Sequence, residues 1–191
     1  KMKKKNVCVL VADGSEEMEV VIVVDVLRRA GVSVFLAGVG EETRMVTTSR
    51  GVRIAPDGAW DPAEANRFDA LVIPGGIGGT EAMCADASVK QAVRDFVAAG
   101  KWVASICAGP TVLRDAGVLT GRRFTCHPAC REDLQSAGTW VDERVVRDGN
   151  IVTSQAPGTA FAFALALVEL LESRATAQNV AIVNGKAVPT S

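Results

Sequence analysis

The chain contains 191 residues, of which 48% are hydrophobic and 23% charged, and its formal net charge is -1. This length and balance suit one globular domain spanning residues 1–191, and the charge lacks the basic footprint of nucleic-acid-binding proteins. The longest apolar stretch is Ala160–Val168, far below the roughly 20 residues that span a bilayer. We therefore expect a cytoplasmic protein with neither nucleic-acid nor membrane partners.

The N-terminus is basic, with four lysines among residues 1–5, and we expect it to be frayed. The apolar run behind it, Val7–Ala12, stops at Asp13 and is too short for a signal peptide. Five cysteines, an odd number in a chain of moderate size, favour reduced thiols over a disulfide framework. His127 is the only histidine, so no mechanism can draw two histidines from this chain.

Strands and helices are predicted to alternate from the N-terminus. The continuous apolar run Val7–Ala12 is typical of a strand buried on both faces. Ser15 is expected to cap a helix that runs to Ala30 and ends at Gly31. Val32–Ala37 is predicted to be the next strand, which completes a β-α-β unit.

The same alternation continues along the rest of the chain. The tail after Ala175 stays unassigned, although Asn184-Gly185 is a turn signal, and a loop is expected through Pro56, Asp57 and Pro62. The expected strands are Arg44–Thr47, Val52–Ile54, Asp69–Ile73, Lys101–Ile106, Arg123–Cys126 and a hairpin of Arg144–Arg147 with Ile151–Ser154. The expected helices are Ser88–Ala99, Pro110–Ala116, Pro128–Ala137 and Pro157–Ser173.

This alternation predicts an α/β fold with a mostly parallel sheet that is covered by helices on both faces. Ligands of such sheets bind beyond the carboxyl ends of the strands. Three strand ends here have unusual sequences, at residues 13–19, 74–76 and 107–110. We expect these three segments to converge and to mark the site.

Cys107 lies where the apolar strand ending at Ile106 turns into a helix that opens with Gly109-Pro110. A helix N-terminus favours an anion and lowers the pKa of a thiol placed there, and the thiolate is the nucleophilic form. Cys107 is therefore the predicted nucleophile. Cys8, inside a strand, is expected to be a core residue.

Two further strand ends supply groups that suit a nucleophilic thiol. Pro74-Gly75-Gly76 exposes backbone amides that could hold an oxyanion, although a simple tight turn is the alternative. No Lys-Ser/Thr follows, so a P-loop is excluded. Glu19 could lie near Cys107, where a raised pKa would let it exchange protons near neutrality.

His127 could act as a base or orienting group for Cys107, although a lone histidine is more often structural. Cys126, His127 and Cys130 also suggest zinc. A structural zinc site needs four ligands, and Cys84 would have to reach from the far side of a helix, so we expect no metal.

Five segments together resemble the ThiJ/PfpI superfamily, and within it the parkinsonism-associated deglycase branch of glutathione-independent glyoxalases. The resemblance covers roughly Val7 to Glu172. The segments are Asp13-Gly14-Ser15-Glu16-Glu17-Met18-Glu19, Pro74-Gly75-Gly76, Ile106-Cys107-Ala108-Gly109-Pro110, Cys126-His127-Pro128 and Pro157-Gly158-Thr159.

The resemblance implies a flavodoxin-like three-layer sandwich, a homodimer and no cofactor. It implies a reactive Cys107 that is hydrogen-bonded to Glu19, with His127 nearby and the Gly76 and Ala108 amides forming an anion pocket.

The resemblance also places Arg29 and Arg50 near the dimer interface, with Arg50 reaching toward the partner's site. Two positions depart from the family pattern: Gln155 stands where relatives often carry arginine, and Ile77 makes the pocket mouth more apolar.

The residues and the activities that the resemblance implies leave three functions open. The first is conversion of reactive aldehydes, such as methylglyoxal to lactate, with protein deglycation as a related activity. The second is a redox sensor or holdase chaperone of oxidative stress, in which Cys107 oxidises to sulfenic and then sulfinic acid. The third is a peptidase or amidase, which two positions disfavour. The protease branch of the superfamily has a histidine directly after the nucleophile, where this chain has Ala108. Amidases of similar fold have a glutamate two residues after a late histidine, and none stands there after His127.

Overall fold

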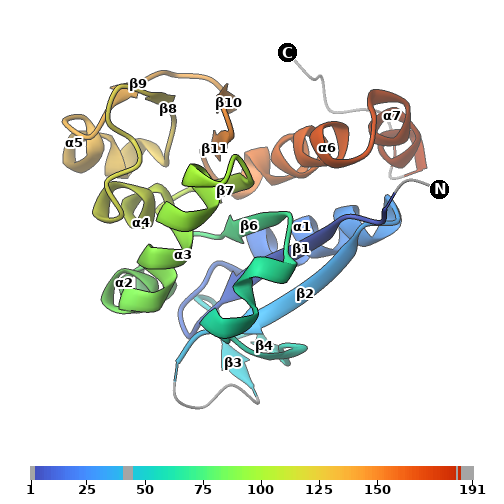
Figure 1. The fold of residues 1–191 in the computed structure, drawn as a ribbon, viewed down its shortest axis with the longest axis horizontal. Coiled ribbons are helices and arrows are strands. Elements are labelled where there is room, and N and C mark those ends of the chain that lie inside the picture. Colours follow the sequence, from blue (N-terminus) through green and yellow to red (C-terminus); the bar gives the residue numbers. More distant parts are fainter. Residues whose placement is uncertain (1–2, 41–44, 184, 186–191) are drawn as a thin grey trace.

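The structure, a computed structural model, describes residues 3–40, 45–183 and 185. Its centre is a seven-stranded sheet in the order β10-β11-β7-β6-β1-β2-β5 (Figure 1). Neighbouring strands are parallel except for the antiparallel pair β10–β11. The strands are β1 (Asn6–Val11), β2 (Ser33–Gly38), β5 (Gly58–Ala59), β6 (Ala70–Ile73), β7 (Trp102–Ile106), β10 (Val145–Asp148) and β11 (Ile151–Ser154).

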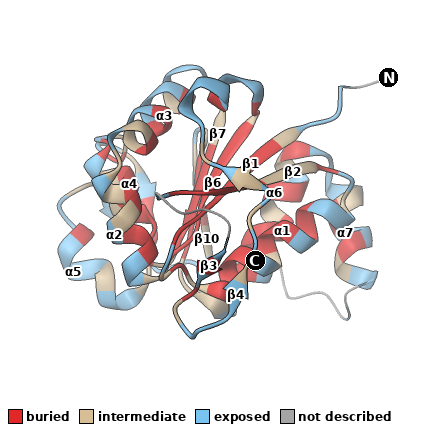
Figure 2. Cartoon of the chain, turned by 90° about the horizontal axis from the view of Figure 1, so that it is seen from below, coloured by how far each residue is buried: buried red, intermediate tan, exposed pale blue. Residues whose placement is uncertain are grey.

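Helices cover both faces of this sheet, as Figure 2 shows by the buried strands between two helical layers. Val9 of β1 packs in one core with α1 and α6, whereas Leu10 packs in the opposite core with α3 and α4. This alternation follows from the two-residue period of a strand. The flavodoxin-like three-layer sandwich is thus confirmed. The α-helices are α1 (Glu17–Arg29), α2 (Ile77–Ala85), α3 (Ala87–Ala98), α4 (Pro110–Asp115), α5 (Arg131–Leu134), α6 (Ala160–Leu171) and α7 (Arg174–Val183).

Two small sheets and three 3-10 helices complete the fold. The paired strands β8 and β9 lie with α5 on the side of the molecule opposite α7 (Figure 1). These elements are β3 (Val46–Thr47), β4 (Arg53–Ile54), β8 (Arg123–Phe124), β9 (Thr139–Trp140), η1 (Pro62–Arg67), η2 (Pro128–Cys130) and η3 (Pro157–Thr159).

Several sequence predictions of element bounds are wrong. The helix expected over Pro128–Ala137 is only the short pair η2 and α5. The glycine-rich segment after β6 was not expected to be helical, yet α2 begins at Ile77, and α7 occupies the unassigned tail. Strand β5 and η1 lie in the region predicted as a loop. Arg44 and Asn184 lie outside the described residues.

The cap of α1 also differs from the prediction. Ser15 is fully buried, and its hydroxyl oxygen accepts a hydrogen bond from the Ala12 amide at 3.0 Å, within the turn. The carboxylate of Glu16 caps the helix by accepting the Glu19 amide at 2.8 Å. The charged cap also suits the positive end of the helix dipole.

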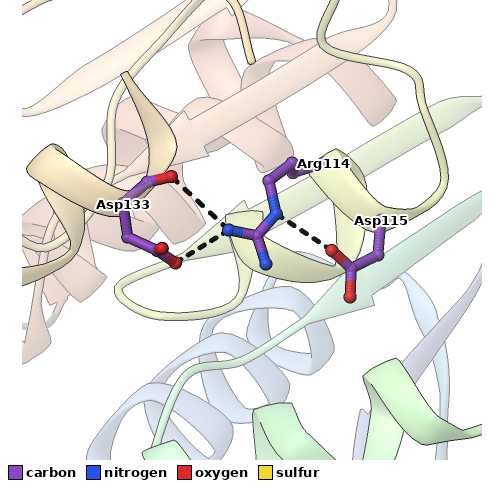
Figure 3. Close-up of polar contacts among 3 residues, drawn as sticks. All are labelled: Arg114, Asp115 and Asp133. Atoms are coloured by element: carbon purple, nitrogen blue, oxygen red, sulfur yellow. Dashed lines mark hydrogen bonds and ion pairs between the residues drawn. The ribbon is translucent and has the colours of Figure 1, made fainter. Parts of the chain in front are cut away.

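A branched ion pair ties α4 to α5 (Figure 3). The Arg114 guanidinium donates to the carboxylate of Asp133 at 2.7 Å and to that of its neighbour Asp115 at 2.9 Å. Arg114 follows the Cys107 turn along α4, and Asp133 lies on the helix after His127. The ion pair therefore links two segments that approach the predicted site.

Among the described residues, no helix combines the length and apolar character needed to cross a bilayer.

Candidate functional site

The three unusual strand ends converge at the carboxyl edge of the sheet, as the sequence predicted. The Glu16 amide donates to the Gly75 carbonyl at 3.0 Å, which joins the turn after β1 to the turn after β6. The His127 amide donates to the Cys107 carbonyl at 2.9 Å, which adds a fourth segment from further along the chain.

Cys107 is the only non-glycine residue with positive φ in the described part of the chain, with φ 66°. The left-handed region costs an L-residue roughly 1–2 kcal/mol, so this turn is strained. The main chain is tightly packed just after this turn: a Cβ on Gly109 would lie 2.8 Å from the Ile73 and Pro74 carbonyl oxygens. The half-buried thiol is thereby presented at the top of β7.

Glu19 lies beside this thiol from α1 and is fully buried. Its Oε2 accepts the Gly75 amide at 3.0 Å, while Oε1 has no hydrogen-bond partner among the described residues. The carboxyl lies near enough to the Cys107 thiol for each group to shift the pKa of the other. Burial raises the pKa of Glu19 to about 7, against the lowering effect of the Cys107 and Gly75 hydrogen bonds. Glu19 therefore exchanges its proton near neutral pH.

The pKa of the Cys107 thiol is raised, first by burial and then by the neighbouring Glu19 carboxylate. The predicted depression by a helix N-terminus is thus wrong, because α4 is only six residues long and the nearest charge is negative. Amides of Ala108 and Gly76 act in the opposite direction by donating toward the sulfur. Cys107 and Glu19 together hold one proton above neutral pH, and that proton rests on the thiol.

The glycines after β6 have two distinct roles. The Gly75 amide is already used by Glu19, so it is not free for an oxyanion, contrary to the prediction. Its lack of a side chain is required, because a Cβ would lie 2.5 Å from Cys107 Cβ. The Gly76 and Ala108 amides are the pair that faces the sulfur.

His127 is half-buried at the start of η2, and its Nδ1 accepts the Ala129 amide at 3.0 Å. Through this contact His127 caps η2, and its Nδ1 is occupied as an acceptor. Its role as a base for Cys107 stays a prediction.

A cavity of about 590 Å³ opens above Cys107. Arg50 lines it from the same chain, and Ile77 stands 74% exposed at its mouth. Cys130, which the sequence suggested only as a zinc ligand, is half-buried and also lines this cavity. The remaining lining residues are Gly14, Glu16, Met18, Ser49, Gly76, Gly78, Cys107, Ala108, His127, Ala129 and Pro157.

The other predicted residues lie elsewhere. Arg29 pairs with Asp25 on the exposed face of α1 and does not line the Cys107 cavity. Gln155 donates from its side-chain amide to Asp142 at 2.9 Å. Within the described ranges, no three His, Cys, Asp or Glu side chains are grouped to hold a metal ion.

Known proteins match this chain over most of its length. Residues 5–170 match the DJ-1/PfpI family. The Protein dj-1beta of Drosophila melanogaster is 42% identical over 93% of this chain and 95% of its own. The glutathione-independent glyoxalase DJR-1.2 of Caenorhabditis elegans is 37% identical over 89% of this chain and 90% of its own.

Solved structures agree with these relatives. The crystal structure of Drosophila melanogaster DJ-1beta superposes with a TM-score of 0.92 at 41% identity, covering 97% of this chain and 100% of that one. Schizosaccharomyces pombe DJ-1 gives 0.87 at 31% identity, over 96% and 100%. With the matched residues extending over nearly the whole chain, the protein belongs to the DJ-1/PfpI family.

Proposed function

We propose that the protein converts small 2-oxoaldehydes into 2-hydroxy acids without glutathione or a cofactor, with methylglyoxal and lactate as the simplest pair. The observation that carries this proposal is the buried Glu19 beside the Cys107 thiol, with a pKa of about 7. A relative named a glutathione-independent glyoxalase supports the same reaction.

The first step is addition of Cys107 to the aldehyde. The Glu19 carboxylate takes the thiol proton as the sulfur bonds to the aldehyde carbon. The carbonyl oxygen becomes an alkoxide that takes this proton from Glu19, which is then again a carboxylate. The Ala108 and Gly76 amides stabilise negative charge at the sulfur as the bond forms. The product is a hemithioacetal.

The second step moves a proton between the two substrate carbons. The Glu19 carboxylate removes the proton from the former aldehyde carbon, and the enediol that forms is reprotonated on the adjacent carbon. The result is a thioester of lactate on Cys107. One buried carboxyl that exchanges protons near neutral pH suffices for both transfers, so His127 is not needed as a base.

The third step is hydrolysis, in which water attacks the thioester carbon and the Cys107 sulfur leaves. The half-buried thiol and the open cavity admit water to this bond. The Arg50 side chain at the cavity supplies positive charge for the carboxylate product. The same steps on an adduct carried by a protein would release it, which is the related deglycation activity.

The test measures lactate from methylglyoxal in the absence of glutathione. We expect Cys107→Ala to abolish turnover and Glu19→Gln to lower kcat/KM by about 10²–10⁴-fold, the range of a lost general base. Cys84→Ser, a half-buried thiol outside the cavity, is the matched control and should leave turnover unchanged. A fully reduced wild type without turnover would contradict the proposal.

A redox-sensing or holdase role at the same thiol is the second candidate. Cys107 is accessible from the cavity, and one similar solved structure is that of oxidized Toxoplasma gondii DJ-1. Chaperone activity that changes with peroxide, in a protein without aldehyde turnover, would favour this candidate.

We also propose a homodimer formed through the groove between α1 and β4. This groove of about 590 Å³ is lined by Arg29 and by the apolar side chains of Val21 and Ile54, and Val21 is 49% exposed. Sedimentation should show a dimer for wild type and a monomer for Val21→Glu. A wild-type monomer at micromolar concentration would contradict the proposal.

A further inference from the structure

The cavity contains a second thiol that aldehyde conversion does not use. Cys130 is half-buried and lines the same cavity as Cys107. It is the last residue of η2, whose three residues are all at least partly exposed.

Short backbone links hold Cys130 close to the Cys107 turn. The His127 amide donates to the Cys107 carbonyl at 2.9 Å, and the Cys130 amide donates to the His127 carbonyl at 2.8 Å. Cys130 therefore lies one 3-10 turn from His127, whose backbone amide is hydrogen-bonded to Cys107. A disulfide needs Cα atoms about 4.4–6.8 Å apart, and Cys130 lies on a three-residue turn that is not part of the central sheet.

The other three cysteines are held away from the cavity. Cys8 is fully buried inside β1, and Cys126 is fully buried beside the Trp140 indole. Cys84 lies on α2 beside the Asp115 side chain. None of these three cysteines lines the cavity that contains Cys107 and Cys130.

We propose that Cys130 is the resolving thiol of a two-cysteine cycle that reduces hydroperoxides at Cys107. The Cys107 sulfur attacks the terminal peroxide oxygen, an S–O bond forms and the O–O bond breaks. The thiol proton passes through Glu19 to the departing alkoxide, which leaves as an alcohol or water. The sulfur is thereby oxidised to a sulfenic acid.

Cys130 then attacks the sulfenic sulfur. The S–S bond forms, the S–O bond breaks, and hydroxide leaves as water with the Cys130 proton. An external dithiol returns both cysteines to thiols and is itself oxidised to a disulfide. Burial and the Asp133 charge raise the pKa of Cys130. At neutral pH Cys130 therefore still carries the proton that converts the departing hydroxide into water. The disulfide also protects Cys107 from sulfinic acid, which dithiols do not reduce.

The test treats fully reduced protein with one equivalent of hydrogen peroxide, blocks free thiols and maps tryptic peptides without reduction. Cleavage places Cys107 in Trp102–Arg114, whereas Cys126 and Cys130 share Phe124–Arg131. We expect these two peptides to be cross-linked through Cys130, as located by fragmentation, and to separate with dithiothreitol. The intact mass should fall by two hydrogens.

In Cys130→Ser the cross-link should be absent, and one equivalent of peroxide should leave Cys107 as a sulfenic acid. A second equivalent should convert it to a sulfinate with two added oxygens, which dithiothreitol does not reverse. Cys84→Ser and Cys126→Ala should retain the cross-link. The proposal is overturned if wild type and Cys130→Ser form sulfinate at equal rates, or if the disulfide lies between Cys126 and Cys130 within one peptide. This result needs only a nucleophilic Cys107, so it is independent of aldehyde turnover.

Discussion

The two walls of the cavity are built in different ways. On the wall that holds the nucleophile, strand-end turns approach so closely that a Cβ on Gly76 would lie 2.2 Å from the Gly14 carbonyl oxygen. On the second wall, Cys130 belongs to the short 3-10 helix η2 and His127 is the N-cap of that helix, which is held by single hydrogen bonds. The first wall is fixed by contacts of the main chain, and the second depends on a few polar contacts.

This difference separates two tasks. Bond formation at Cys107 requires Glu19 at a fixed place, and main-chain packing gives a precision that flexible side chains cannot give. Substrate fit and disulfide formation require a wall that can shift, and short exposed elements allow it. We therefore expect changes on the first wall to cost more stability than changes on the second.

The largest expected effect comes from adding one methyl group to the rigid wall. In Gly75→Ala the new Cβ would meet Cys107 Cβ at 2.5 Å and Glu19 Oε2 at 2.9 Å, and the strained turn cannot yield. We expect the free energy of unfolding to fall by about 3 kcal/mol. The control is Gly158→Ala, whose Cβ meets nothing within 4 Å. Equal urea midpoints for the two variants would show that this wall is not tightly packed.

The next effect is a pH dependence of stability that originates at Glu19. Its pKa is about 7 in the fold against an ordinary 4.5, so the folded state binds the proton more tightly. The resulting stability is fully present below pH 4.5 and is lost as pH rises through 7, a change of about 3 kcal/mol at most.

Glu19→Gln cannot ionise and should lack this loss. Urea titrations at pH 5 and pH 8 should therefore show the variant gaining stability relative to wild type at the higher pH. A constant difference between the two proteins would mean that the pKa of Glu19 is not raised.

On the second wall we expect a smaller effect from the cap of η2. His127→Ala removes the acceptor of the Ala129 amide and should cost about 1 kcal/mol of unfolding free energy, as for a lost helix cap. His127→Asn supplies another acceptor and should retain most of the stability. The interpretation of His127 as a cap fails if Asn and Ala are equally destabilising in urea unfolding.

The smallest effect concerns the ion pair that supports this wall. Arg114→Gln removes the contacts to Asp115 and Asp133 shown in Figure 3. Because these groups are partly exposed, the expected loss is about 0.5 kcal/mol, and it should shrink in high salt. Arg94→Gln, which has no ion pair among the described residues, is the control for thermal unfolding.

The sheet and the rigid wall could largely be predicted from the sequence. Apolar runs such as Val7–Ala12 mark strands that are buried on both faces, and all such strands end at one edge of a parallel sheet. That edge brings Glu19 and Cys107 together although they are far apart in the chain. Each strand could be predicted from its local sequence pattern, and the parallel sheet topology then places the strand ends together.

The start of α2 could not be predicted, because two glycines in its first turn argue against a helix. Gly78 and Gly79 are there for a tertiary reason: they admit the main chain of the Gly14-Ser15 turn within about van der Waals distance. The same contact buries Ser15 and takes it away from the cap. Tertiary packing requirements of this kind leave no recognisable pattern in the local sequence.

The direction of the Cys107 pKa shift could not be predicted from the sequence either. A thiol before a helix suggests a stabilised thiolate, but the outcome depends on how deeply it is buried and which oxygen faces it. Likewise, nothing in the spacing showed that Cys130 lines the cavity while Cys126, four residues earlier, faces the core. A short 3-10 turn decides that difference.

The central claim, that Glu19 takes the Cys107 proton, is tested most directly by the pH dependence of alkylation at Cys107. The rate of iodoacetamide addition would be followed on the Trp102–Arg114 peptide in wild type, Glu19→Gln and Glu16→Gln. We predict a rate in wild type that rises as pH passes through about 7, and no such step in Glu19→Gln. Glu16→Gln should retain the step at lower pH, because the Glu16 charge raises the pKa of Glu19. The same profile in wild type and Glu19→Gln would contradict the claim.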